Sequence, residues 1–240
     1  MKMRLDRLMV DRGLAESREK AQALIMAGEV RINGQKAVKP GQPVEDGCTV
    51  EVLSRPPYVS RGGFKLAGAL RHFVLDVTGK VCLDIGSSTG GFVDVLLQAG
   101  AARVHAVDCG TGQLDWKLRT DSRVVLHEGI NARSLTFEDI GELVDFLCCD
   151  VSFISVTLIL PAVTPLLRHG GQMVILIKPQ FEVGKGQVGK GGIVRDPELH
   201  RAACEKVERA VRETGFECEI IESPIAGAEG NKEFLLYARH

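Results

Sequence analysis

The sequence of 240 residues lacks the long apolar segments of membrane and secreted proteins. Its longest apolar stretch, residues 156–167, is interrupted by Pro161 and Pro165 and is too short to span a bilayer. Residues 1–16 carry charges every two or three positions and contain no apolar run of signal-peptide length. We therefore expect a cytoplasmic protein that makes no membrane contact.

Cysteine pairs and hydrolase motifs are also missing. The seven cysteines are irregularly spaced and include no C-x-x-C pair, which excludes zinc-knuckle and thioredoxin motifs. The histidines form no metal-ligand motif, so we expect no metal site. Ser87, Ser88 and Ser152 lack the G-x-S-x-G context of a hydrolase nucleophile. Several cysteines lie in apolar segments, where a thiol behaves as a small hydrophobic group, so we expect a reduced protein.

The chain has almost no net charge, because 30 Lys and Arg residues balance 31 Asp and Glu residues to give −1. Taken whole, this balance argues against a protein that binds nucleic acid. However, residues 1–71 hold 13 basic and 8 acidic side chains (+5), whereas residues 72–240 hold 17 and 23 (−6). Such asymmetry is typical of a nucleic-acid contact at one end of a chain.

Basic residues near the N-terminus are candidates for that contact, with an ordinary solvated helix face as the alternative. Residues 1–57 contain no aromatic side chain, which argues against stacking on single-stranded bases and leaves recognition of phosphates and shape. The candidate contacts are Arg4, Arg7, Arg18, Lys20, Arg31 and Lys36.

The first part of the chain has the pattern of a small α+β domain. One helix is predicted before Gly13, and a second between the cap residue Ser17 and Gly28. Their spacing predicts buried faces made by Leu5, Leu8 and Met9, and by Ala21, Leu24 and Ile25.

A hairpin and a linker follow these helices. The turn pair Asn33-Gly34 predicts that residues 30–32 pair with residues 35–38, and residues 50–52 alternate as a last strand. Two consecutive prolines, Pro56 and Pro57, then mark a linker. The predicted division is a domain of residues 1–54, a linker of residues 55–60 and a domain of residues 61–240.

After the linker, short apolar runs alternate with helical segments. This pattern predicts a doubly wound parallel sheet, which binds ligands at the carboxyl ends of its strands. The predicted strands are Val81–Ile85, Val104–Asp108, Val124–His127, Val144–Cys149, Met173–Ile177, Phe216–Glu222 and Phe234–Ala238, and the predicted helices are Phe92–Gln98, Ser155–Leu167 and Pro197–Thr214.

Residues 86–91, which follow the first of these strands, form a glycine-containing loop before a predicted helix. Such a loop lets a ligand approach the backbone, yet it matches neither the G-x-G-x-x-G pattern nor a Walker A loop. Asp84 would repel a pyrophosphate but suits a ligand that carries an ammonium group, such as S-adenosylmethionine (SAM). Asp108 ends the next strand, where a carboxylate can hold both ribose hydroxyls. A tight turn that binds no ligand is the alternative.

Two further charged residues end predicted strands at the same edge of the sheet. Asp150 follows the fourth strand and Lys178 follows the fifth. A lysine in this place can steer a hydroxyl proton, although either residue could equally be a surface charge. The nearby G-x-x-x-x-G-K match at residues 184–190 lacks the Ser/Thr that a P-loop needs, and we interpret it as a basic lid or a solvated loop.

Several segments of the sequence resemble two known families. Residues 4–38 resemble the S4-type RNA-binding module, which is named after a ribosomal small-subunit protein. The remaining motifs resemble the TlyA (hemolysin A) family, which is similar to the FtsJ-type methyltransferases. These motifs are Ser60-Arg61-Gly62-Gly63-Phe64-Lys65-Leu66, Asp84–Phe92, Asp150-Val151-Ser152-Phe153-Ile154-Ser155 and Lys178-Pro179-Gln180-Phe181-Glu182.

This resemblance implies a Rossmann-like fold that uses SAM to methylate ribosomal RNA, within ribosomal subunits, on a ribose 2′-oxygen of cytidine by direct transfer. It also implies a Lys-Asp-Lys-Glu tetrad and a set of cofactor residues. The implied tetrad is Lys65, Asp150, Lys178 and Glu233. The implied cofactor residues are Asp84, Gly86, Ser87, Ser88, Thr89, Gly90, Phe92 and Asp108, with Asn131 and Phe153 near the adenine and the methionine moiety.

Two other functions remain open from the sequence. One is a membrane-lytic protein, which the family's historical name suggests and which needs an amphipathic or spanning segment. The other is a non-catalytic RNA-binding or ribosome-assembly factor. The presence of Asp84, Asp108 and the four tetrad residues argues against the second.

Overall fold

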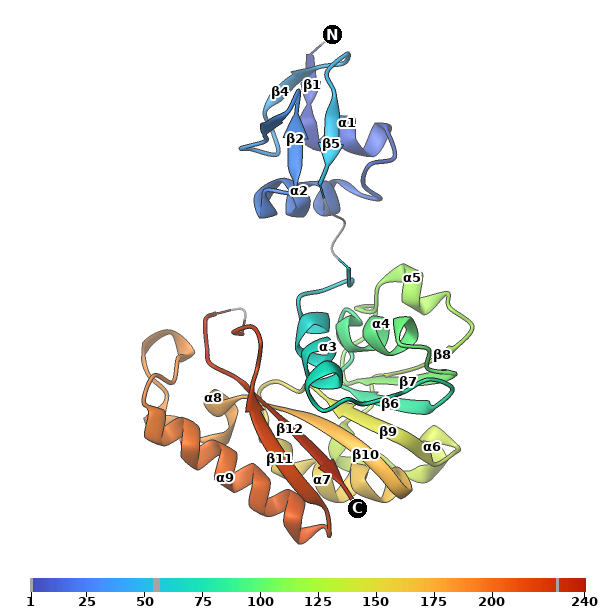
Figure 1. The fold of residues 1–240 in the computed structure, drawn as a ribbon, viewed down its shortest axis with the longest axis vertical. Coiled ribbons are helices and arrows are strands. Elements are labelled where there is room, and N and C mark those ends of the chain that lie inside the picture. The colour runs from blue at the N-terminus through green and yellow to red at the C-terminus, as the bar shows by residue number, and fades with distance from the viewer. Residues whose placement is uncertain (1, 54–56, 228) are drawn as a thin grey trace. The chain divides into compact units, whose positions relative to one another are not determined.

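The computed structural model describes residues 2–53, 57–227 and 229–240. The chain divides into two compact units, Met1–Pro57 and Tyr58–His240 (Figure 1). Residues 55 and 56 of the predicted linker lie outside the described residues, whereas residues 58–60 belong to the second unit. There the backbone N–H of Val59 donates to Asp94 at 2.9 Å, which fixes the chain just before the first helix of this unit.

The first unit packs two helices against short antiparallel strands around one small core. The predicted hairpin forms, with Asn33 and Gly34 both at positive φ (47° and 82°), as a tight two-residue turn requires. The elements are β1 (Lys2–Arg4), α1 (Leu5–Asp11), α2 (Arg18–Ala27), β2 (Val30–Ile32), β3 (Gln35–Lys36), β4 (Pro43–Glu45) and β5 (Val50–Val52).

Helix α2 begins and ends at the residues that the sequence predicts. The Ser17 side chain accepts a hydrogen bond from the backbone N–H of Lys20, and Gly28 ends the helix in the left-handed conformation. Ala21, Leu24 and Ile25 are buried, as their spacing predicts. The strands β1 and β4, which pair with each other, were not predicted, because they lie far apart in the chain and no turn pair such as Asn33-Gly34 joins them.

The second unit contains a seven-stranded sheet in the order β11-β12-β10-β9-β6-β7-β8 (Figure 1). The strands β10, β9, β6, β7 and β8 are parallel, and β12 is antiparallel to both of its neighbours. The strands are β6 (Val81–Ile85), β7 (Arg103–Asp108), β8 (Val124–Glu128), β9 (Val144–Cys149), β10 (Leu167–Ile177), β11 (Glu217–Glu222) and β12 (Phe234–Arg239). The helices are α3 (Gly62–His72), α4 (Gly91–Gln98), α5 (Trp116–Arg119), α6 (Phe137–Ile140), α7 (Leu160–Val163), α8 (Pro179–Glu182) and α9 (Pro197–Glu213).

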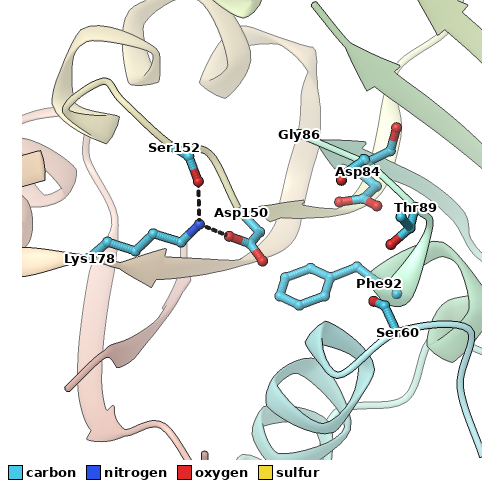
Figure 2. A pocket seen from close by; sticks show the side chains of 11 residues that line it. Ser60, Asp84, Gly86, Thr89, Phe92, Asp150, Ser152 and Lys178 are labelled. Atoms are coloured by element: carbon cyan, nitrogen blue, oxygen red, sulfur yellow. Dashed lines mark hydrogen bonds and ion pairs between the residues drawn. The ribbon is translucent and has the colours of Figure 1, made fainter. Parts of the chain in front are cut away.

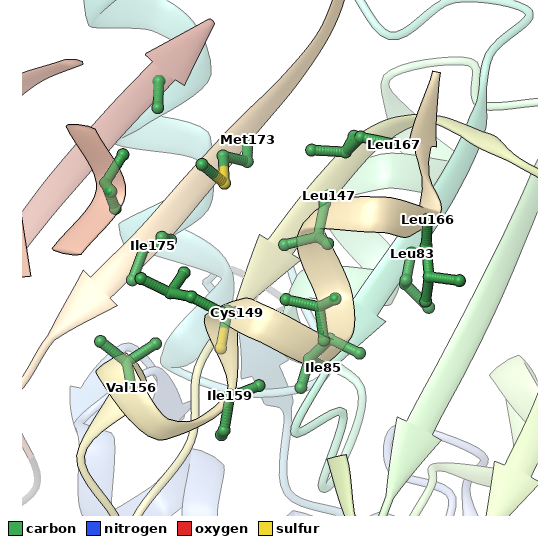
Figure 3. Packing of buried hydrophobic residues seen from close by; sticks show 14 of the residues in the cluster. Leu83, Ile85, Leu147, Cys149, Val156, Ile159, Leu166, Leu167, Met173 and Ile175 are labelled. Atoms are coloured by element: carbon green, nitrogen blue, oxygen red, sulfur yellow. The ribbon is translucent and has the colours of Figure 1, made fainter. Parts of the chain in front are cut away.

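Helices cover both faces of this sheet, as a doubly wound fold requires. On one face, α3, α4 and α5 enclose a core with the side chains of alternate strand residues. On the other face, α6, α7 and α9 enclose the second core, part of which Figure 3 shows. Cys148 faces the first core and Cys149 the second, and both thiols are buried as small hydrophobic groups.

One predicted helix forms only as three short helical segments. The sequence pattern predicts a helix over residues 155–167, and the structure contains two 3₁₀ turns, Val156–Leu158 and Thr164–Leu166, on either side of the one-turn helix α7, Leu160–Val163. Pro161 and Pro165 each stand in the first turn of a new helical segment, since a proline in a helix interior removes a hydrogen bond and clashes with the preceding turn. Strand β10 then begins six residues earlier than predicted, at Leu167.

Within the ranges that the structure describes, no helix is long and apolar enough to cross a membrane.

Candidate active site

The strands β6 and β9 lie side by side where the strand order of the sheet reverses, which is the place where such sheets bind ligands. Asp84 lies on β6, and Asp150 follows β9 directly, with its backbone N–H bonded to Ile85 O at 2.9 Å. A cavity of about 160 Å³ opens here (Figure 2). It is lined by Ser60, Asp84, Gly86, Ser87, Ser88, Thr89, Gly91, Phe92, Asp150, Ser152 and Lys178.

The loop after β6 presses closely against the end of β9. Gly86 has φ +84°, and a Cβ there would lie 2.4 Å from Asp150 O, so only glycine fits. Asp108 joins this loop to the residues after β7, because its carboxylate accepts the backbone N–H of Ser88 at 2.8 Å and that of Gly110 at 2.7 Å. These contacts hold the loop after β6 in a fixed conformation along one side of the cavity.

Asp84 is the most deeply buried carboxyl group of the cavity. Its side chain is almost fully buried, and burial raises its pKa to about 8. The thiol of Cys148 donates to Oδ1 at 3.4 Å, whereas Oδ2 has no partner among the described residues. The hydroxyl of Ser87 is buried and unpaired as well. A lone buried carboxylate oxygen fits a ligand that brings a cationic donor, which agrees with the ammonium group of SAM.

Lys178 and Asp150 form an ion pair on the same cavity. Lys178 Nζ lies 2.5 Å from Asp150 Oδ1 and donates to Ser152 Oγ at 2.9 Å (Figure 2). Both ionic side chains are mostly buried, with exposed fractions of 11% and 19%. The pair places a cation and a carboxylate where a bound hydroxyl can meet them.

Lys65 and Glu233 form a second, deeper ion pair. Lys65 Nζ lies 2.6 Å from Glu233 Oε2, and the side chains are 10% and 3% exposed. Neither residue lines the cavity, although α3, which carries Lys65, approaches it: a Cβ on Gly62 would lie 4.0 Å from Asp150 Oδ2. The four residues of the predicted tetrad thus form two separate ion pairs.

Two serines that line the cavity were not among the predicted site residues. Ser60 precedes α3, and a Cβ on Gly91 would lie 2.3 Å from its hydroxyl oxygen, so the loop before α3 packs tightly against the start of α4. Ser152 binds Lys178. Both residues belong to motifs that carry the family resemblance, and this was the only signal in the sequence that could have found them.

Four predicted cofactor residues do not line the cavity: Gly90, Asp108, Asn131 and Phe153. Gly90 has φ +96° and packs against Leu118. Asn131 is exposed and accepts the backbone N–H of Arg133. Phe153 is 91% exposed with φ +66°, and its ring centroid lies 5.3 Å from that of Phe181.

A buried carboxylate ties together the two loops that follow β9 and β10. Glu182 Oε1 accepts the backbone N–H of Val156 at 2.8 Å, and Oε2 accepts the Ser155 hydroxyl at 2.5 Å and Lys206 Nζ at 2.9 Å. Because Asp150 precedes the first loop and Lys178 precedes α8, this cluster fixes the separation of the Asp150–Lys178 pair.

The six predicted nucleic-acid contacts are all exposed on the first unit. Arg7 and Lys20 pair with exposed carboxylates of their own neighbourhood, Asp11 at 3.7 Å and Glu16 at 2.6 Å. Arg31 lies opposite Lys36 on β3 and opposite Glu51 on β5. The like charge of Lys36 favours an anionic partner, and Glu51 offsets part of this effect.

Comparison with known proteins gives matches over both units. Residues 58–240 match the FtsJ-like methyltransferase family, and residues 3–50 match the S4 domain. The chain is 49% identical to the 16S/23S rRNA (cytidine-2′-O)-methyltransferase TlyA of Mycobacterium tuberculosis, with 98% of this chain and 89% of the relative covered. It is 44% identical to Hemolysin A of Brachyspira hyodysenteriae, with 98% and 99% covered.

A solved structure is similar along the whole chain. A candidate hemolysin from Streptococcus thermophilus superposes with a TM-score of 0.77 at 47% identity, covering 99% of this chain and 88% of that one.

Proposed function

Because the chain belongs to the TlyA family, an FtsJ-like SAM-dependent methyltransferase preceded by an S4 domain, we propose that it methylates ribosomal RNA on a ribose 2′-oxygen of cytidine. One observation carries the proposal. The Lys178–Asp150 ion pair opens onto the same small cavity as the unpaired carboxylate oxygen of Asp84. A cation-binding group and a hydroxyl-binding pair thus share one cavity, which a methyl transfer to a hydroxyl requires.

The cofactor is held by the loop after β6. Asp84 binds the ammonium group, and the fixed backbone at Gly86 lets the ligand lie close to the chain. The Ser60 and Ser87 hydroxyls offer further polar contacts. Bound SAM supplies a methyl group that its sulfonium already activates. The remaining cofactor residues of the proposal are Ser88, Thr89, Gly90, Phe92, Asp108, Asn131 and Phe153.

The chain contributes positioning and proton removal. Lys178 lies nearest to the ribose hydroxyl, and the hydroxyl proton passes to the Lys178–Asp150 pair as the ribose oxygen attacks the methyl group. Asp150 and Ser152 hold the Lys178 side chain in place. The Lys65–Glu233 pair completes the tetrad, because it holds α3 against the start of β12 and so supports the elements around the cavity. Lys65 and Glu233 act in this scheme without lining the cavity.

The first unit supplies affinity for the RNA. Its exposed basic residues contact phosphates, which gives binding without base reading, in keeping with the absence of aromatic side chains in residues 1–57. Ribosomal subunits are the expected form of the substrate. The contacts are Arg4, Arg7, Arg18, Lys20, Arg31 and Lys36.

The proposal is tested by transfer of a labelled methyl group from SAM to ribosomal subunits and to naked rRNA. We expect label in the RNA with at least one of these substrates. An enzyme that binds SAM but labels neither substrate would contradict the proposal and favour an RNA-binding assembly factor.

A further inference from the structure

Asp6, at the start of α1, is a fully buried carboxylate in a unit whose other acidic side chains lie at the surface. Its Oδ1 atom accepts Arg4 Nε at 3.0 Å and the backbone N–H of Arg7 at 2.9 Å. Its Oδ2 atom accepts Arg4 Nη2 at 2.8 Å, Arg18 Nη2 at 3.2 Å and Gln22 Nε2 at 2.9 Å. Asp6 therefore joins β1, α1 and α2.

The two arginines that meet at Asp6 remain open to solvent. The side chain of Arg4 is 53% exposed and that of Arg18 is 52% exposed. Both guanidinium groups bind the same carboxylate oxygen, which holds them side by side although they come from different elements. Arg4 also lies against Gly41, where a Cβ would approach its Nη1 atom to 3.0 Å.

The hydrogen bonds from Arg4 are the main reason why the pKa of Asp6 lies well below its ordinary value. The carboxylate is therefore ionised at every pH at which the protein would work, and its hold on both arginines does not vary with pH. The exposed edges of the two guanidinium groups keep free donors in a fixed geometry, which suits the planar, bidentate recognition of a phosphate.

We infer that Asp6 is a positioning residue, which holds Arg4 and Arg18 as a preformed pair that binds an RNA backbone phosphate. The inference rests on the proposed function, because it needs the first unit to bind RNA. An arginine that is free in solution must give up side-chain freedom when it binds, whereas the Asp6-bound pair has given it up on folding. Removing the negative charge of Asp6 is therefore expected to weaken binding to RNA, whereas the change in net charge alone would strengthen it.

The test measures the affinity of the full chain for purified ribosomal subunits over a series of KCl concentrations. For Asp6→Asn we expect affinity lower by about tenfold and a salt slope smaller by about one to two, which corresponds to one or two lost phosphate contacts. The matched control is Asp11→Asn, which raises the net charge equally but removes an exposed carboxylate that pairs with Arg7. Its affinity should equal or slightly exceed that of the wild type.

A second measurement separates positioning from a purely structural role. When Arg4→Ala and Arg18→Ala are already present, adding Asp6→Asn should cause no further loss of affinity, because Asp6 acts through these arginines. If the loss of affinity from Asp6→Asn adds in full to the losses from Arg4→Ala and Arg18→Ala, Asp6 contributes to fold stability alone. If Asp6→Asn does not fold, as judged by circular dichroism, Arg18→Lys replaces it: the charge is kept and the planar donor geometry is lost. Wild-type affinity of Arg18→Lys would contradict the inference.

The two proposals fail in different ways. A wild-type chain that does not bind subunits at low salt contradicts the proposed function of the first unit, and the inference with it. A wild-type chain that binds, together with an Asp6→Asn variant that behaves like Asp11→Asn, contradicts the inference alone.

Discussion

Lys178 Nζ lies 2.5 Å from Asp150 Oδ1, and this ion pair bridges the carboxyl ends of two neighbouring parallel strands, β9 and β10. The Ser152 hydroxyl oxygen adds a second contact to Lys178 Nζ at 2.9 Å. A lysine held by two acceptors has a fixed direction, and its ammonium group faces the cavity that Asp84 also lines. In the proposed mechanism, this pair meets the substrate hydroxyl and takes up its proton.

Replacing Lys178 by alanine should lower the rate of methyl transfer by about 10²- to 10⁴-fold, the usual contribution of a positioned proton-transfer group. SAM affinity, measured by calorimetry, should stay close to that of the wild type, because Asp84 and the loop after β6 are untouched. Lys232→Ala, at an exposed lysine that pairs with Glu222, is the control and should retain full activity. Unchanged turnover in Lys178→Ala would remove Lys178 from the mechanism.

SAM binding should release a proton from Asp84. Burial raises the pKa of this carboxyl to about 8, so at pH 7 the free protein carries it mostly protonated. A bound cation favours the ionised form, and binding at pH 7 therefore expels close to one proton. Calorimetry in buffers of different ionisation enthalpy counts this proton. When SAM binds to Asp84→Asn, no proton should be released from this position. Any proton release that remains in the variant comes from other groups, such as the amino group of SAM, and can be subtracted.

The raised pKa of Asp84 also determines whether stability and SAM affinity rise or fall with pH. Because the folded pKa of Asp84 exceeds that of the unfolded chain, the native state keeps a proton that the unfolded chain loses. The contribution of Asp84 to stability thus falls as pH rises from about 4 to about 8, whereas SAM affinity rises over the same range. A SAM affinity in the wild type that declines between pH 6 and pH 7.5 would contradict this assignment.

Breaking the Lys65–Glu233 pair should destabilise the second unit. Lys65→Met leaves the Glu233 carboxylate buried and unpaired, which costs about 3 kcal/mol in the free energy of unfolding, measured by urea denaturation. Lys232→Met is the matched control, because it breaks an exposed pair with Glu222 and should cost less than about 1 kcal/mol. Equal losses in the two variants would show that burial of the Lys65–Glu233 pair has no energetic weight.

Glu182→Gln should lower the turnover number by about ten- to a hundredfold with little change in KM for SAM. The neutral amide weakens the contacts of this side chain with Lys206 and Ser155. The loops that follow β9 and β10, next to Asp150 and Lys178, are then no longer held together by a shared carboxylate. Glu208→Gln, which breaks an exposed pair with Arg212 on α9, is the control. If Glu182→Gln changes KM for SAM and leaves turnover intact, Glu182 acts on the cofactor instead.

The sequence predicted the parts of the fold that carry strong local patterns. The turn pair Asn33-Gly34 and the apolar runs of the parallel strands all formed as expected. The helix predicted over residues 155–167 is divided into three short helical segments, because Pro161 and Pro165 each interrupt the backbone hydrogen bonds of a continuous helix. Short elements such as α5 and α6 carry one turn each, too little for periodicity to detect.

The site was only partly predictable. Strand-end position alone located Asp84, Asp150 and Lys178, because parallel strands bring their carboxyl ends to one edge. The Lys65–Glu233 pair joins α3 to the start of β12, far apart in the chain, and no periodicity links them; only the family resemblance named them. Asp6 and Glu182 carry no charge pattern that distinguishes them from surface acids, since their importance comes from burial that only the folded chain shows.

The central claim is tested most directly by nucleoside mass spectrometry of rRNA after incubation of ribosomal subunits with the enzyme and SAM. We expect new 2′-O-methylcytidine with the wild-type chain and, in the same incubation time, at least about a hundredfold less with Lys178→Ala. A methyl group on a base, on a ribose of another nucleotide only, or equal amounts of 2′-O-methylcytidine with both chains would contradict the account.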